Sequence, residues 1–216
     1  MNKNLILLSF TAFLIMFTGQ AKADIVYSNI FGTPGYSSNS GWLIGTPLNY
    51  EQGESFTPTA NYTLTNIELA AGNIYGTNSI NVQLMNDNSG QPGSILESFS
   101  FSSLGPFGST YPLLSANSVL DPTLDAGKQY WLVASPPDSS SAEAWNWNIG
   151  NYVEPLATSQ DNGTTWNIGS PVLAGAFLVE GTPVGVNPVP EPSSLALFAM
   201  ALLAGGMILR KKLNFA

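Results

Sequence analysis

The sequence predicts an all-β protein whose body folds as an antiparallel, jelly-roll-like β-sandwich. Turn-forming residues recur about every ten residues, the spacing of short strands in sandwiches and barrels. The stretches between the turns are rich in β-branched and aromatic residues, which favour strands over helices. The body contains no amphipathic helical segment of useful length, so sheet packing on sheet is the most economical architecture.

The clearest local element is a β-hairpin. Ile80, Val82 and Leu84 alternate with polar residues and should face one side of a strand. Residues 86–93 are a dense group of turn formers, and a second alternating run follows at 95–101. The residues expected on one face of this second strand are Ile95, Glu97, Phe99 and Phe101.

Three further segments complete the predicted body. Residues 62–69 form a strand in which the apolar phase slips by one position, so we expect a β-bulge near Thr65. Residues 127–134 and 174–179 have the composition of well-buried strands. The Gly- and Pro-rich residues 181–188 are predicted to be an extended linker, so the domain should occupy residues 24–180.

The N-terminal 23 residues have the three parts of a secretory signal peptide. Lys3 gives a positive start, residues 5–17 are apolar, and Ala21 and Ala23 form a small-x-small cleavage site. Cleavage would leave Asp24 as the new N-terminus, which implies export machinery and a signal peptidase as partners. An uncleaved membrane helix is less favoured because the apolar run is short.

The C-terminal segment 189–216 carries a short motif, an apolar run and a basic end. Residues 193–209 contain no charge, and 17 helical residues span about 25 Å, slightly less than a hydrocarbon core of about 30 Å. A transmembrane helix is therefore expected here, at least transiently in the membrane, with its basic end on the cytoplasmic side. The flanking motif residues are Val189, Pro190, Glu191, Pro192, Arg210, Lys211 and Lys212.

This segment resembles the PEP-CTERM sorting signal, which an exosortase recognises in Gram-negative bacteria that make exopolysaccharide. The resemblance implies that the tail is removed or exchanged during export. It also implies a location in the cell envelope, on the outer surface or in the extracellular matrix, where the protein would be associated with exopolysaccharide or biofilm. The alternative is an ordinary C-terminal membrane anchor behind a proline-rich hinge.

Charge limits the partners of the body. The whole chain has a net charge of −8, but five of its six basic residues lie in the end segments. The body contains one basic residue, Lys128, and thirteen carboxylates, so its net charge is −12. Such a surface repels nucleic acid, whereas neutral glycans or cation-bridged acidic glycans remain compatible partners.

The chain contains neither cysteine nor histidine. Disulfides, His- or Cys-based nucleophiles and His/Cys zinc sites are therefore excluded. Glycoside hydrolysis would need two carboxyl groups about 5–10 Å apart, and Glu51 with Glu54 or Glu143 with Glu154 could be assembled into such a pair. With thirteen carboxylates such pairs arise by chance, so we expect no enzymatic activity.

The body resembles the choice-of-anchor domains, type R most nearly. These are extracellular β modules paired with interchangeable C-terminal anchors, and the resemblance implies an exported module without an established catalytic role. The segments that carry it are residues 54–58, 61–67, 82–84 with 87–93, and 124–133.

A sharper motif runs from Ser159 to Trp166 and resembles the Asp box of sialidases and other β proteins. An Asp side chain can accept turn amides, a Gly two positions later can adopt positive φ, and the Trp can fold back over the hairpin. The resemblance implies a structural staple. Its residues are Ser159, Asp161, Gly163, Thr165 and Trp166.

Aromatic side chains in polar surroundings are the candidate glycan site. Alternation places Trp145 and Trp147 on one face of a strand, and Tyr152 and Trp42 lie in similar Asn- and Gly-rich stretches. The alternative is that this face is the sandwich core. No cofactor is expected, although the oxygen-rich turns at Asp87 and Asp161 are weak candidates for Ca²⁺.

Overall fold

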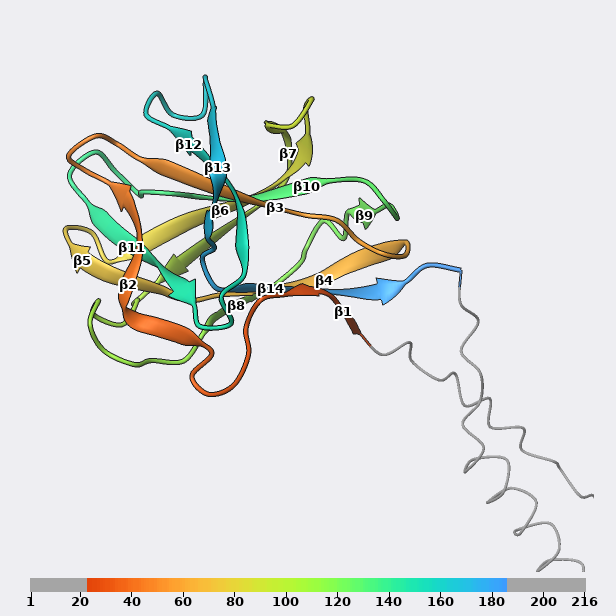
Figure 1. Ribbon diagram of the computed structural model, residues 1–216, viewed down its shortest axis with the longest axis horizontal. Helices are drawn as coiled ribbons and strands as arrows, with labels where there is room; N and C mark the ends of the chain where they lie inside the picture. Colours follow the sequence, from red (N-terminus) through yellow and green to blue (C-terminus); the bar gives the residue numbers. More distant parts are fainter. Residues whose placement is uncertain (1–22, 186–216) are drawn as a thin grey trace, which may run out of the picture. The chain divides into compact units, whose positions relative to one another are not determined.

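Residues 23–185 are described by the computed structural model, and within that range every regular element is a β-strand (Figure 1). The fold is therefore all-β, as predicted. The fourteen strands are β1 (Asp24–Ser28), β2 (Tyr36–Gly45), β3 (Glu51–Phe56), β4 (Tyr62–Leu69), β5 (Ala71–Tyr75), β6 (Ser79–Asp87), β7 (Pro92–Ser102), β8 (Leu114–Asn117), β9 (Thr123–Leu124), β10 (Tyr130–Ser135), β11 (Ala142–Asn148), β12 (Val153–Ser159), β13 (Asn167–Leu173) and β14 (Phe177–Pro183).

The strands form three antiparallel sheets. A six-stranded sheet has the order β13-β12-β3-β10-β6-β7, and a second sheet has the order β1-β14-β4-β8 with β9 also paired to β4. A three-stranded sheet, β2-β11-β5, stands at one side of these two (Figure 1). The chain crosses between the two larger sheets at β3/β4, β7/β8, β9/β10 and β13/β14, so each sheet combines strands from distant parts of the sequence.

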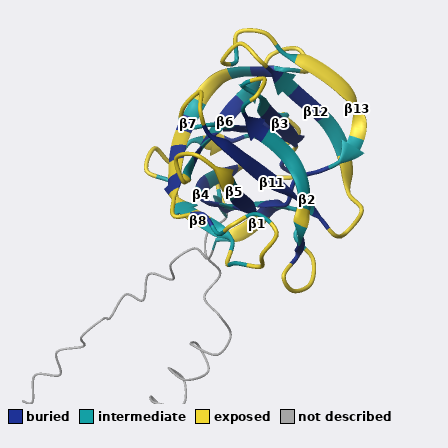
Figure 2. Ribbon diagram, turned by 90° about the vertical axis from the view of Figure 1, so that its left-hand side faces the viewer, coloured by how far each residue is buried: buried dark blue, intermediate teal, exposed yellow. Residues whose placement is uncertain are grey.

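The main core lies between the sheets and is built by alternation along the strands. On β10, Tyr130 and Leu132 face this core, whereas Trp131 and Val133 point to the other side of the six-stranded sheet. There they form a smaller cluster with Met85 and Ala157, against which Trp166 packs. Figure 2 shows the buried stretches of the strands on the inside and the exposed connections around them.

The hairpin of β6 and β7 confirms the predicted pairing. Val82 pairs with Phe99 and Ile80 with Phe101, with these side chains buried. Ile95 is the exception, because the pairing shifts from Leu84↔Glu97 to Met85↔Ile95. The extra residue, Leu96, reverses the alternation, so the expectation that Ile95 shares the inner face is wrong, and its side chain is 51% exposed.

The bulge expected near Thr65 is present. Asn66 pairs with Glu180 and Leu64 with Gly181, which leaves Thr65 as the extra residue of β4. The same ladder continues to Tyr62 and Pro183. The domain therefore extends into the predicted linker, whose first three residues, 181–183, belong to β14.

The signal peptide, the sorting motif and the expected helix 193–209 lie outside the described residues, apart from Ala23 at their boundary and Asp24 in β1. Within residues 23–185, the structure contains no helix long and apolar enough to cross a membrane.

Candidate functional site

Residues 159–166, here named the Asp161 turn, join β12 to β13. Asp161 Oδ1 accepts hydrogen bonds from the Ser159 hydroxyl and the Thr165 amide, both at 2.9 Å, and Oδ2 accepts one from the Thr165 hydroxyl at 2.7 Å. Gly163 has a φ of 72° and its amide donates to the Ser159 hydroxyl. Trp166 then folds back onto the small cluster that includes Ala157. The side chain of Asp161 thus organises the turn.

Replacement of Asp161 by alanine is expected to lower the melting temperature by a few degrees at neutral pH, because the turn loses its central acceptor. The same hydrogen bonds lower the pKa of the Asp161 carboxyl below its ordinary value, and the bond from the Thr165 hydroxyl has the largest effect. The stabilisation is therefore complete above the ordinary carboxyl pKa and is lost as the pH falls through the lowered pKa. Thermal unfolding of both proteins from pH 7 down to pH 2 measures this difference. A difference that persists unchanged at the lowest pH would contradict this role of the carboxylate.

A second turn, residues 86–94, joins β6 to β7 and is named the Asp87 turn. Asp87 Oδ1 accepts the indole N–H of Trp131 at 2.8 Å, and Oδ2 accepts the amide of Gly90 at 3.0 Å. Asn86 Oδ1 accepts the amide of Ser94 at 2.6 Å. Two side-chain acceptors therefore fix the turn to itself and to the six-stranded sheet beneath it.

The two turns form the walls of one groove. It has a volume of about 560 Å³, within the range of sites for small ligands. The groove combines amide, hydroxyl and indole groups, and its lining residues are Asn86, Asp87, Asn88, Gln91, Pro92, Gly93, Ser94, Gly163, Thr164, Thr165 and Trp166. Each turn was recognisable in the sequence, but their juxtaposition was not, because about 70 residues separate them and β10 and β3 lie between their hairpins in the sheet.

The turns give little support to a cation site. Both carboxylates, Asp87 and Asp161, use each of their oxygens as acceptors for protein groups. Among residues 23–185 no three His, Cys, Asp or Glu side chains are grouped so that they could hold a metal ion.

The aromatic residues predicted to bind glycan do not form one exposed face. Trp145 is completely buried, its indole N–H donates to the carbonyl of Ala176 at 3.2 Å, and its ring lies edge-on to Phe177. The prediction that Trp145 forms part of a sugar-stacking face is therefore wrong. Trp145 belongs to the main core, and most residues of β11 are buried on both faces. The pairing of β11 with β2 is irregular between Asn146 and Asn148, so strict alternation does not hold at Trp147.

The other three aromatic residues are divided between two places. Trp42 and Trp147 are half-buried and meet edge-to-face at 5.4 Å, and the indole N–H of Trp42 donates to the carbonyl of Leu173. Tyr152 is exposed and stacks on Phe31 at 5.1 Å, a partner that the sequence did not reveal. These pairs offer small aromatic surfaces, each partly covered by its own partner.

The carboxyl pairs considered for hydrolysis are not assembled as pairs. Glu51 and Glu54 are three residues apart on β3, so their side chains point to opposite faces of the sheet. Glu54 is buried, accepts the amide of Gly175 and has Glu154 as its charged neighbour, whereas Glu143 has Asp138. Burial is the main cause that raises the pKa of Glu54 well above its ordinary value and that of Glu143 to about 8.

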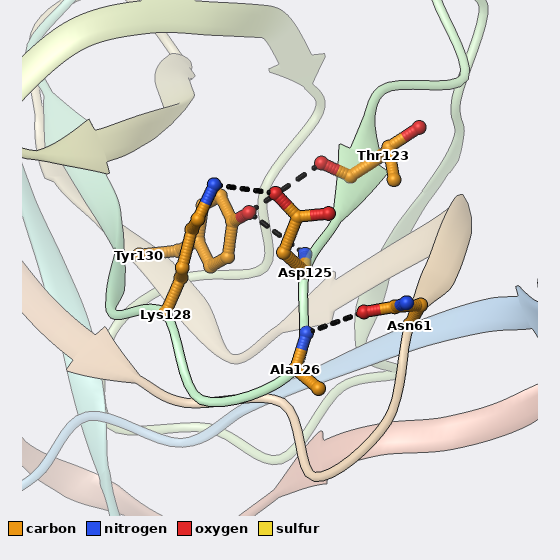
Figure 3. A network of polar contacts seen from close by, with 6 residues as sticks. All are labelled: Asn61, Thr123, Asp125, Ala126, Lys128 and Tyr130. Carbon is orange, nitrogen blue, oxygen red and sulfur yellow. Dashed lines mark hydrogen bonds and ion pairs between the residues drawn. The ribbon is translucent and has the colours of Figure 1, made fainter.

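Lys128, the one basic residue among residues 23–185, lies in the turn before β10 (Figure 3). Its ammonium group pairs with Asp125 at 2.7 Å, on an exposed surface. The turn is held by the Tyr130 hydroxyl, which accepts the amide of Asp125, and by Asn61, which accepts the amide of Ala126 at 2.7 Å. The lysine is thus a solvated ion-pair partner at the surface.

The geometry defines an acidic, antiparallel β domain with a shallow, amide-rich groove. Comparison with protein families finds the PEP-CTERM protein-sorting motif at residues 188–212, directly after the described domain. The motif supports an exported protein that an exosortase processes, directed to the envelope or surface of a Gram-negative bacterium. No curated protein matches the chain.

Proposed function

We propose that this protein is a non-catalytic surface or matrix component that associates with exopolysaccharide after exosortase-dependent export. The observation that carries the proposal is the sorting motif at 188–212, which begins five residues after the last strand of a β domain. The charge of the body, one lysine against thirteen carboxylates, favours a neutral polymer or one bridged by cations.

Three further features belong to the same proposal. A helix at 193–209 holds the precursor in the membrane until processing, and the β domain acts as a choice-of-anchor module. The Asp161 turn acts as an Asp-box staple, a structural role to which its internal hydrogen bonds are suited. A carbohydrate-binding module is the second candidate, favoured by the groove, and a carboxylate-based hydrolase is the third.

The processing step makes a direct prediction. Mass spectrometry of envelope and matrix material should find Asp24 at the mature N-terminus and no peptide beyond about Ser194. Pro190→Ala combined with Pro192→Ala should leave a precursor that retains the tail, whereas Pro183→Ala, outside the matched segment, should be processed normally.

Association is tested in the same cells by separating the exopolysaccharide fraction. The processed protein should be recovered with the polymer and should be released into the medium by a strain that makes no exopolysaccharide. Recovery of residues 210–216 on the mature protein would contradict processing. Unchanged retention in the strain without polymer would contradict the association.

A further inference from the structure

We propose that the groove between the Asp87 turn and the Asp161 turn binds a neutral, polyhydroxylated chain, that is, an oligosaccharide of uncharged sugars. The inference rests on the proposed function, because it names a specific site through which the protein would associate with a polysaccharide. It places that site on the outer side of the six-stranded sheet and away from the aromatic residues of β11.

The groove is held in shape by strands that do not depend on a ligand. Trp131 and Trp166 belong to the apolar cluster on this side of the sheet, and the Trp131 indole N–H fixes Asp87 from below. Pro92 lies against the strand β3 at Gly53, where an added Cβ would stand 3.6 Å from its ring. Both walls therefore rest on the central strands of one sheet, and binding needs little ordering of the chain.

The chemistry of the walls favours an uncharged polar ligand. The side-chain amides of Asn88 and Gln91 make no hydrogen bond with any described residue, yet both line the groove. Amides can donate to and accept from sugar hydroxyls in the same contact. The only carboxylate that lines the groove, Asp87, has both oxygens engaged in the protein, and the acidic body repels an anionic polymer.

Trp166 supplies the apolar contact that sugar recognition requires. Its ring is half-buried, one part packed on the small cluster and the rest at the groove. An indole partly open to solvent beside amide groups can stack on the apolar face of a pyranose ring. The turn that folds this ring back therefore also presents it to the groove.

Two neighbouring depressions share lining residues with the groove, and this extended surface favours a chain over a single sugar. Asn86 and Asp87 also line a neighbouring depression of about 510 Å³ that reaches Lys128 and Tyr130. Thr165 and Trp166 also line another of about 470 Å³, which extends to Gln160 and Asn167. The groove and the two depressions beside it therefore offer contact surface for more than one unit of a polymer.

The test is a titration of the full chain with neutral hexasaccharides of glucose and of mannose, followed by calorimetry and by Trp fluorescence. The protein should be kept in a polyoxyethylene detergent, because a maltoside headgroup would itself compete for a sugar site. The groove variant is Asn88→Ala combined with Gln91→Ala, which removes no hydrogen bond within the described protein. The matched control is Ser98→Ala with Ser100→Ala, two exposed side chains of β7 outside the groove.

At least one neutral hexasaccharide is expected to bind saturably, and the groove variant should weaken it about tenfold at an unchanged melting temperature. The control should bind like the wild type, and Trp166→Phe should weaken binding while it retains an apolar cover. Absence of saturable binding, equal affinity in the groove variant, or tighter binding of a hexauronate than of the neutral chains would each overturn the proposal. The titration does not depend on sorting. It can therefore show no binding while exosortase processing and matrix association are confirmed, and it can show binding while those two are contradicted.

Discussion

Replacing Trp145 with alanine is expected to destabilise the domain by about 3–5 kcal/mol, the usual cost of removing a large aromatic side chain from a core. The ring is completely buried, contacts Phe177 and donates to Ala176. Its neighbour Gly175 packs so closely that an added Cβ would lie 2.6 Å from the indole nitrogen, so the ring is held tightly against the backbone of that segment. Urea unfolding followed by circular dichroism measures the effect.

Trp147→Ala is the matched control, because it removes the same side chain two residues away on the same strand. Trp147 is half-buried and its indole N–H has no partner among the described residues, so the loss should be clearly smaller. Equal stability of the Trp145 variant and the wild type, together with lost glycan binding, would contradict the assignment of Trp145 to the core.

The second large effect is a loss of stability as the pH rises. Glu143 is buried, neither of its carboxylate oxygens has a partner among the described residues, and burial followed by the charge of Asp138 raises its pKa to about 8. In the unfolded chain the carboxyl has its ordinary pKa of 4.5. The folded state therefore binds the proton more strongly, and stability falls between pH 4.5 and about 8 as the unfolded state gains from ionisation.

The expected loss across this interval is on the order of 2 kcal/mol, since relaxation of the protein and entry of water around the newly charged carboxylate reduce the full effect of the shift. Glu54, whose pKa is raised in the same direction by burial, adds to the loss as the pH rises above its ordinary carboxyl pKa. Chemical denaturation at pH 5, 7 and 9 gives the profile. Glu143→Gln should make the fall smaller and leave the part due to Glu54, whereas Asp161→Asn should retain the full fall, because the lowered pKa of Asp161 acts only in the acid range. A wild-type stability that rises from pH 5 to 9 would contradict this account.

Features that depend on neighbouring residues could be predicted from the sequence. The β6–β7 hairpin follows from alternation along 80–84, and the bulge at Thr65 from a slip of that alternation. The prediction for Ile95 was wrong because of the bulge at Leu96. Ile95 and Leu96 are adjacent apolar residues, so the sequence alone allows either of them to face the core. The end of β14 was missed because Gly181 and Pro183 are typical of linkers, although here they pair with β4.

The site depended on information that alternation does not contain. Most of β11 is buried on both faces, so a Trp-x-Trp pattern in polar surroundings could mark a core as well as a binding face. The three-stranded sheet in which β11 is the central strand was not predicted. The groove needs the order of strands in the six-stranded sheet, which places the β6–β7 and β12–β13 hairpins on one sheet. Pairing between strands so far apart in the chain is set by tertiary packing, and local patterns do not specify it.

The pairing of β1 with β14 constrains when this protein can fold during secretion. In the described part of the chain, β1 has β14 as its one ladder partner, and Asp24 lies opposite Gly181. The first strand to emerge from the export channel must therefore wait for the last before its sheet can close. Such a long-range contact slows the completion of the fold, although local hairpins such as β6–β7 do not depend on β14. By the time the domain can close, the sorting motif is the next segment in the chain, so completion of the fold and presentation of the tail to the exosortase become consecutive steps of one passage.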